Sequence, residues 1–324
     1  MQFRTPLSVS PSSWRISHHS SGFALGSCFS EAMASRLAHL KYDITSNPFG
    51  PMYNPSSLAA CIRRVAACRE FEMGELCEWR GVWFSTDSHT LMASPSAEHT
   101  LQRLNSALRT AHEALVRADY VILTLGTNRV YEREGRVVAN CHRLPAEQFV
   151  CRSLGVGEIV EELVSVCQNE LAGKQIILTV SPIRHLKDGL AESSLGKAVL
   201  RVAAAEVAER LPQVCYFPAY EALVDDLRDY RFYAADMIHP SEQAVEYVWQ
   251  LFAGSYLSPA DEALNQTITR LMRSCQHRPL NPSSSECREF LERTIGECRA
   301  FAGVHPEVDL SGEIEELTQR LESL

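Results

Sequence analysis

Two uninterrupted apolar runs constrain the fold of this chain most strongly. DYVILTLG occupies residues 119–126 and KQIILTVSP occupies residues 174–182. An apolar run of this length, without alternating polar residues, is typical of a parallel β-strand buried on both faces. Two shorter runs, GFALGS at 22–27 and VCYFP at 214–218, indicate further strands. We therefore expect a parallel sheet with both faces covered.

Segments with helical periodicity alternate with these strands. Phe29, Met33, Leu37 and Leu40 recur at the spacing of one helix face. Further helices are expected over about 58–68, 97–117, 146–172 and 188–210, and hairpins over 82–94 and around Glu134-Gly135. This order predicts an α/β fold, a three-layer α/β/α sandwich around a parallel sheet.

The pattern changes near residue 259, where polar helices replace the strands. The last residues, EVDLSGEIEELTQRLESL, form an acidic amphipathic pattern. We predict an α/β domain over residues 1–258 and a helical C-terminal extension over 259–324. The extension is a candidate surface for homo-oligomer formation.

Composition excludes several classes of protein. The net charge is -9 and no basic run is present, which disfavours nucleic-acid binding. The N-terminus has no apolar signal core, and no stretch approaches the roughly 18 apolar residues of a membrane span. The 11 cysteines are odd in number and form no CxxC pair, as expected for reduced thiols. We expect a soluble, cytoplasmic protein.

Four segments with reactive side chains follow the expected strands. They are GSC at 26–28, GTN at 126–128, SPIRH at 181–185 and DMIHPS at 236–241. In a doubly wound sheet the ligand binds outside the carboxyl ends of the strands. We therefore expect these four segments to converge on one site.

DMIHPS offers an acid–base pair. Asp236 and His239 are three residues apart on a loop, so the carboxylate can hold one imidazole nitrogen and leave the other as a base. In isolation a surface turn with a helix cap is the better interpretation. GSC opens a helix, where the dipole stabilises negative charge; the alternative is a plain turn with Cys28 packed inside.

The other two segments supply further candidates. The Asn128 amide can donate to an oxyanion, and Gly126 permits close approach of a substrate; a turn that needs Gly and Asn is the alternative. His142 and His185 are candidates for substrate contacts or for satisfied structural groups. No HExxH or CxxC motif supports a metal, and no cofactor is expected.

Taken together, these blocks resemble the GSCFA family, within the SGNH (GDSL-type) hydrolase superfamily. The first motif stands as LGSCFSEAM, with Ser30 where the family name has Ala. The similarity extends through NPFGPMYNP, LGTNRVYE, VVANCHRLPAEQF, SPIRHLKDG and the segment ending in DMIHPS. It covers roughly residues 22–250.

The resemblance implies roles for individual residues. It maps the nucleophile segment onto Gly26 to Cys28, the oxyanion-hole glycine onto Gly50, and the Gly-x-Asn block onto 126–128. The Asp-x-x-His block maps onto Asp236 and His239, whereas Arg129 replaces the Asp that usually follows the asparagine.

The first block departs from the superfamily's Gly-Asp-Ser. An ungapped match places Cys28 at the nucleophile position, and a shifted register places Ser27 there. We favour Cys28, because it opens the helix and adjacent side chains point different ways.

The resemblance implies a hydrolase of ester or thioester bonds, or an acyltransferase using the same site. A small-molecule or carbohydrate-linked acyl ester would be the substrate. The alternative is a non-catalytic ligand-binding module that retains the fold.

Overall fold

A computed structural model of the chain describes residues 4–187, 189–279, 281 and 284–324. The chain divides into two compact units. The larger unit comprises residues 4–10, 21–34 and 44–253, and the smaller comprises residues 11–20, 35–43 and the residues from 254 onward. None of the helices in these described ranges has the length and apolar character needed to cross a bilayer.

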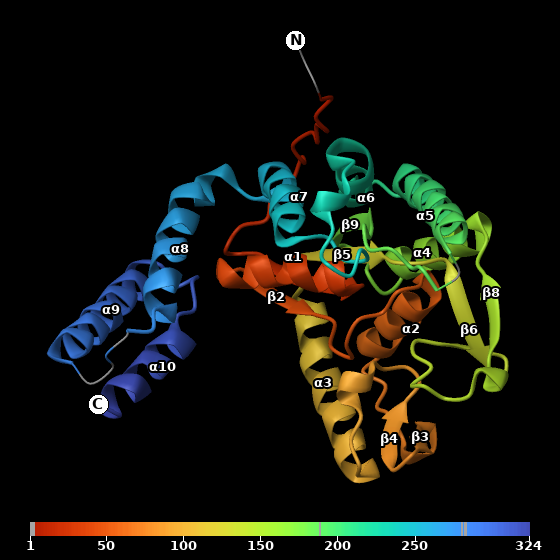
Figure 1. Cartoon of the computed structure of the whole chain (residues 1–324), viewed down its shortest axis with the longest axis horizontal. Coiled ribbons are helices and arrows are strands. Elements are labelled where there is room, and N and C mark those ends of the chain that lie inside the picture. The colour runs from red at the N-terminus through yellow and green to blue at the C-terminus, as the bar shows by residue number, and fades with distance from the viewer. Residues whose placement is uncertain (1–3, 188, 280, 282–283) are drawn as a thin grey trace. The chain divides into compact units, whose positions relative to one another are not determined.

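A five-stranded sheet forms the centre of the larger unit. Its strands are β1 (Ser21–Gly26), β2 (Asp43–Ser46), β5 (Tyr120–Leu125), β9 (Gln175–Val180) and β10 (Val214–Phe217). They are ordered β10-β9-β5-β1-β2, and β1–β5, β5–β9 and β9–β10 pair in parallel. Figure 1 shows helices around β5 and β9. The predicted three-layer α/β/α class is confirmed.

Both faces of the sheet are buried, as the unbroken apolar runs require. Leu25, Leu123 and Leu178 belong to one core cluster, together with apolar residues of the helices α2 (Pro55–Ala66), α3 (Ala97–Arg117), α4 (Val156–Gln168) and α5 (Leu190–Arg210). Side chains alternate along a strand, so neighbours such as Ile122 face the opposite side and are buried as well. On that side Phe252 of α7 (Glu242–Tyr256) packs edge-on against Phe217, with ring centroids 5.4 Å apart.

Local sequence explains where the first helices begin. Helix α1 (Cys28–His39) follows β1 directly, as expected. Helix α2 begins three residues before the predicted start, because the Asn54 side chain accepts the N–H of Ser57 at 2.8 Å and Pro55 occupies its first turn. This cap proves important, because it also fixes a side chain of the site described below.

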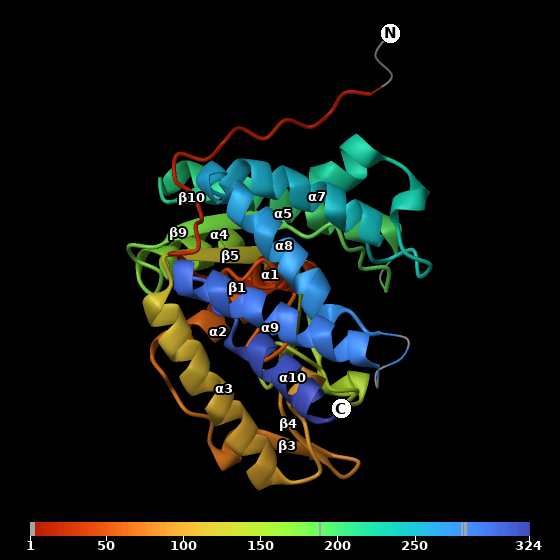
Figure 2. The same ribbon diagram turned by 90° about the vertical axis from the view of Figure 1, so that its left-hand side faces the viewer.

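The hairpin expected over 82–94 forms only as a single antiparallel bridge, in which Trp83 and Ser94 exchange backbone hydrogen bonds of 2.8 and 3.2 Å, and not as two paired strands. Strand β4 (Val82–Ser85) pairs instead with the preceding β3 (Leu76–Trp79), through a turn in which Arg80 and Gly81 both have positive φ. Such a two-residue turn matches the twist of paired strands. Residues Thr90–Met92 form a short 3-10 helix. Figure 1 and Figure 2 show α3 running beside this hairpin.

The helix expected over 146–172 was too long. Its first part is a 3-10 turn, Ala146–Gln148, and a strand, β8 (Val150–Ser153). Strand β8 pairs with β6 (Arg129–Arg133), which forms the correctly predicted hairpin with β7 (Arg136–Val138). Helix α4 then begins after Gly155, whose N–H donates to the Glu158 carboxylate at 2.8 Å.

The remaining elements are short or belong to the smaller unit. Helix α6 (Ala219–Glu221) continues into a π-helical turn, Ala222–Leu227, and 3-10 turns cover Tyr230–Phe232, Met73–Glu75 and Pro259–Asp261. Helices α8 (Glu262–Gln276), α9 (Ser285–Val304) and α10 (Ser311–Glu322) bury their own apolar cluster, which includes Leu271, Leu291 and Leu317. The predicted helical C-terminal region is therefore confirmed.

Candidate active site

One cavity of about 440 Å³ collects residues from all four segments, three of which directly follow β1, β5 and β9, whereas DMIHPS follows the 3-10 turn Tyr230–Phe232. Cys28 comes from GSC, Thr127 from GTN, Arg184 and His185 from SPIRH, and His239 from DMIHPS. Its wall is completed by Tyr53, Asn54, Arg129, Tyr131, Val138, Ala139, Asn140, Cys141, Ile183, Lys187 and Ile238. The convergence expected at the carboxyl ends of the strands is thus observed.

Asp236 and His239 are joined by side-chain and backbone hydrogen bonds. Asp236 Oδ2 lies 2.6 Å from His239 Nδ1, and its Oδ1 accepts the backbone N–H groups of Ile238 and His239 at 2.9 and 3.0 Å. The His239 N–H, the His239 imidazole and the Ile238 N–H together lower the pKa of Asp236 to about 2. Asp236 is therefore ionised at neutral pH and holds Nδ1, leaving Nε2 as the ring nitrogen open to a substrate.

The loop geometry that makes this pair needs Met237 in a left-handed conformation, with φ 58°. Two backbone bonds close the turn: Ala234 donates to the His239 carbonyl and Met237 donates to the Ala234 carbonyl. The Arg184 N–H also donates to the carbonyl of Ile238 at 3.2 Å, which joins this loop to the segment after β9.

Ser27 and Cys28 occupy different environments. Ser27 is fully buried; its Oγ donates to Ser181 Oγ at 2.9 Å and accepts the N–H of Phe29 at 3.3 Å. Cys28 lines the cavity, and its Sγ lies 3.8 Å from the hydroxyl of Tyr53. Ser27 therefore serves the start of α1, and of the two residues Cys28 is the one that lines the cavity.

Tyr53 was not anticipated from the sequence. Burial, followed by the nearby Cys28, raises the pKa of its phenol, so the hydroxyl stays protonated and can donate toward the sulfur. Its carbonyl accepts the N–H groups of Gly126 and Thr127 at 2.7 and 2.9 Å. In the sequence, this region is indicated only by the block NPFGPMYNP. The residue that the resemblance assigns there, as the oxyanion-hole glycine, is Gly50.

Two residues assigned to the oxyanion hole are engaged elsewhere. Gly50 adopts φ +82° in a turn and its N–H donates to the Asn47 carbonyl at 2.8 Å. The buried Asn128 amide donates to the carbonyl of Leu154 at 3.1 Å, and its Oδ1 lies against Gly196. Neither lines the cavity. We therefore place both in the scaffold, because they lie outside the cavity lining and the Gly50 N–H and one N–H of the Asn128 amide are bonded to backbone carbonyls.

Asn54 is better placed as a donor. It lines the cavity, and its Oδ1 is held by the Ser57 N–H at the start of α2. With the oxygen fixed, the orientation of the amide is set, and Nδ2 has no protein acceptor among the described residues. The N–H of Cys28 is a second donor, since the first amide of a helix has no acceptor within that helix.

Gly126 lies behind the cavity and is not among its lining residues. A side chain here would come within 2.9 Å of the Tyr53 carbonyl and 3.3 Å of His185 Nε2. Its own N–H is taken by Tyr53 and its carbonyl accepts from Lys197. Glycine is needed because three segments meet at this point.

The two candidate histidines, His142 and His185, lie in different places. His142 is buried, its Nε2 donates to the carbonyls of Ser85 and Ser88, and its ring stacks on Phe84 at 4.1 Å, so it is a structural group. His185 does line the cavity. Burial, then the charges of Lys197 and His239, lower the pKa of His185 to about 4, so it is neutral at physiological pH.

Lys197 was also not anticipated. Its Nζ donates to the carbonyls of Gly126 and Ser181, both at 2.6 Å, and its side chain is almost fully buried. These carbonyls follow β5 and β9, so one amine ties together the two strand ends that carry the site. Burial lowers the pKa of Lys197 to about 7. Within the described ranges it forms no ion pair with a carboxylate.

The burial of Lys197 predicts a loss of folding stability that depends on pH. An unfolded lysine titrates near 10.4, so between pH 7 and pH 10 the unfolded chain binds more protons at residue 197 than the folded protein does. Burial of the protonated Lys197 amine lowers the free energy of unfolding by its full amount below about pH 7, and this loss of stability becomes smaller as pH rises. The stability of wild type relative to Lys197→Met should therefore increase by about 2 kcal/mol from pH 7 to pH 9. Urea unfolding of both proteins at each pH measures this, and a constant difference would contradict it.

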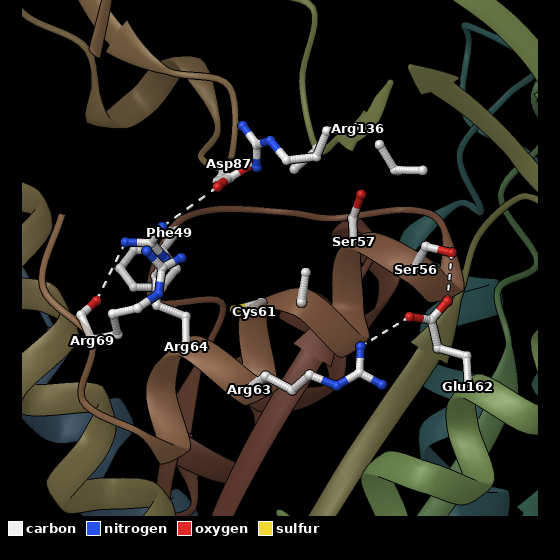
Figure 3. Close-up of a pocket in the computed structure, with 13 residues that line it drawn as sticks. Phe49, Ser56, Ser57, Cys61, Arg63, Arg64, Arg69, Asp87, Arg136 and Glu162 are labelled. Atoms are coloured by element: carbon white, nitrogen blue, oxygen red, sulfur yellow. Dashed lines mark hydrogen bonds and ion pairs between the residues drawn. The ribbon is translucent and has the colours of Figure 1, made fainter. Parts of the chain in front are cut away.

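A larger cavity, about 540 Å³, lies elsewhere in the α/β unit (Figure 3). Its guanidinium groups already face carboxylates: Arg63 lies 3.1 Å from Glu162, and Arg136 lies 2.5 Å from Asp87. Buried Arg64 contacts Glu75 and Asp87. Each of its four arginines contacts a carboxylate, and it shares Ala139 with the cavity at the strand ends but is lined by none of the site residues expected from the sequence. We therefore place the site at the strand ends.

Among the described residues, no group of three or more His, Cys, Asp or Glu side chains could hold a metal ion. Metal independence stays a prediction.

No curated protein matches the chain. The model of the GSCFA family, however, matches residues 22–252, and that of the GSCFA domain protein, C-terminal domain, matches residues 268–323. The first match spans every segment of the cavity and more than half of the sequence, and the chain therefore belongs to the GSCFA family.

Proposed function

We propose that this protein is an acyl hydrolase, or an acyltransferase using the same site, of the SGNH type with a cysteine nucleophile. The observation that carries the proposal is one shared cavity. Cys28 and His239 both line it, and Asp236 holds His239 Nδ1 at 2.6 Å. The cavity thus brings together the residue types that acyl transfer uses as nucleophile, base and orienting acid, and the hydrogen-bond contact of Cys28 Sγ within it is to the Tyr53 hydroxyl, at 3.8 Å.

The first step is acylation of Cys28. His239 Nε2 accepts the thiol proton while Sγ forms a bond to the acyl carbon of an ester or thioester. The carbonyl π pair becomes an oxyanion. When the tetrahedral intermediate collapses, the C–O or C–S bond to the leaving group breaks, and His239 returns the proton to that group as an alcohol or thiol.

The second step removes the acyl group. His239 accepts a proton from water while the water oxygen attacks the thioester carbon, and the Cys28 thiol is reformed as the carboxylic acid departs. An acceptor hydroxyl in place of water completes acyl transfer. Either reaction uses the same residues and the same proton path.

The oxyanion donors in this proposal are the Asn54 amide and the Cys28 N–H. Each donor directed at the developing charge is worth on the order of 3 kcal/mol in an acyl transfer of this kind. The protonated Tyr53 hydroxyl adjoins the sulfur and stabilises the negative charge that develops on it as the thiol proton leaves.

A second candidate is a ligand-binding module without turnover. Two observations favour it: the nucleophile position carries Cys in place of the superfamily's Ser, and both Gly50 and Asn128 have their donors engaged. The fold and the cavity are equally compatible with this function.

Trapping of the acyl-enzyme separates the two functions. We expect rapid mixing with 4-nitrophenyl acetate to release 4-nitrophenolate and to leave one acetyl group on the peptide that contains Cys28. His239→Ala should prevent this modification. Mass spectrometry of the digested protein identifies the modified residue. No acetylation of Cys28, with release no faster than that caused by unfolded protein, would favour the binding module.

The finer expectations from the sequence stay predictions. They are an O-acylated carbohydrate or other small acyl ester as substrate, a cytoplasmic location, a domain boundary at residue 258, and self-association through the C-terminal helices.

A further inference from the structure

The cavity differs in charge from the chain as a whole. The sequence has 31 Lys and Arg against 40 Asp and Glu, a net charge of -9. The described residues that line the cavity include Arg129, Arg184 and Lys187, and none of them is Asp or Glu. The Asp236 carboxylate is bonded to His239 and is not part of the lining. An acidic protein thus presents cations around its reactive sulfur.

Aromatic rings hold two of these cations. The Arg184 guanidinium lies 3.9 Å from the ring centroid of Tyr233 and 5.0 Å from that of Tyr230. Stacking uses the face of the guanidinium, so its N–H groups, which point outward in its plane, stay available to an anion. Lys187 Nζ lies 5.0 Å from the Tyr131 ring centroid and donates to its hydroxyl at 3.0 Å.

The connection to His239 suggests which part of a substrate these cations meet. Arg184 is joined to the His239 loop by its N–H bond to the Ile238 carbonyl. In the proposed reaction His239 protonates the leaving group, so the leaving group must depart on the His239 side of the acyl carbon. Arg184 lines the cavity next to this loop, and together with Tyr233, on which its guanidinium stacks, it also lines an adjoining cavity of about 210 Å³. The N-terminus of α1, at Cys28, adds the positive end of a helix dipole to the first of these cavities.

We propose that the acyl donor is an ester or thioester whose leaving group carries a carboxylate or phosphate, and that Arg184, assisted by Lys187, binds this anion. The inference rests on the proposed acyl-transfer function for the identity of the donor. It adds a specificity that the catalytic residues alone do not impose, since Cys28, His239 and Asp236 treat neutral and anionic leaving groups alike.

A matched pair of chromogenic esters tests the proposal. 4-Nitrophenyl acetate is neutral, and 5-acetoxy-2-nitrobenzoate carries one carboxylate on an otherwise identical leaving group. Each kcat/KM is divided by the rate of uncatalysed hydrolysis of the same ester. We expect the anionic ester to be favoured about tenfold or more at low ionic strength, and the preference to shrink in 0.5 M NaCl because salt screens the attraction.

Variants assign the preference to one side chain. Arg184→Gln should lower the ratio of anionic to neutral kcat/KM at least about fivefold, whereas Arg184→Lys, which keeps the charge, should retain most of it. Arg117→Gln is the control, because Arg117 is exposed and does not line the cavity. It removes the same charge from the protein and should leave the ratio unchanged.

Binding distinguishes failure of this inference from failure of the proposed function. Calorimetric titration compares 5-hydroxy-2-nitrobenzoate with 4-nitrophenol, neither of which needs turnover. If neither ester is hydrolysed but the carboxylate binds more tightly and Arg184→Gln removes this difference, the anion site stands and the acyl-transfer function falls. If both esters are hydrolysed with equal preference in wild type and Arg184→Gln, the anion site is overturned.

Discussion

Cys28→Ala is expected to lower kcat/KM for 4-nitrophenyl acetate by about 10⁴-fold or more, because removing a nucleophile leaves only substrate binding and oxyanion stabilisation. Ser27→Ala should stay within about tenfold of wild type. It should instead lose about 1–3 kcal/mol of stability, because Ser181 and the Phe29 N–H both lose a buried partner. Steady-state kinetics and urea unfolding of the two variants separate these effects.

Alkylation provides an independent measurement of the same residue. The chain has 11 cysteines, and those at 61, 167, 275, 287 and 298 are buried. Cys28 should react with iodoacetamide faster than the other ten, and its alkylation should proceed in parallel with the loss of activity. Exposed Cys151 is the internal reference for accessibility without activation. If Cys28→Ala remains active and Ser27→Ala is dead, the protein is a serine hydrolase despite the burial of Ser27.

Asp236→Asn should lower kcat by up to about 10⁴-fold. An asparagine preserves the shape of the side chain but cannot hold His239 in the tautomer that leaves Nε2 unprotonated. His239→Ala should be at least as damaging, because it also removes the proton acceptor. Circular dichroism and unfolding curves establish that both variants are folded before their kinetics are compared.

The Asp236–His239 pair also predicts how the activity depends on pH. Because the pKa of Asp236 is lowered to about 2, this carboxylate stays ionised down to about pH 3. Any loss of activity between pH 5 and pH 7 must therefore come from another group. In Asp236→Asn the rate should be lower at every pH, with no new transition below pH 5.

The helical unit contains a matched control. His305 Nδ1 lies 3.1 Å from Glu307 Oε1, so Glu307→Gln makes the same chemical change in a second carboxylate–histidine pair. This variant should keep wild-type kinetics. If Asp236→Asn behaves like Glu307→Gln, then Asp236 shapes its loop through the N–H groups of Ile238 and His239 and takes no part in catalysis.

The fold class and the place of the site followed from the sequence alone. Unbroken apolar runs are found where a strand is buried on both faces, so 119–126 and 174–182 predicted β5 and β9. Parallel strands place their carboxyl ends at one edge, and this topology brought four separate motifs to one cavity. The Asp236–His239 pair could also be predicted from the sequence, because both residues lie on one short loop.

Only the tertiary structure decided which side chains reach that cavity. Asn128 and Gly50 follow the expected motifs, yet their donors are used by Leu154 and Asn47. Tyr53 and Asn54 lie in the NPFGPMYNP block, where the expected residue is Gly50, and Lys197 lies in no motif of the sequence analysis. The Lys197 amine meets the Gly126 carbonyl across 71 residues of chain, and Tyr53 meets Cys28 across 25. Periodicity describes which face of an element is buried, whereas the partner of a buried donor is set by the packing of segments distant in sequence.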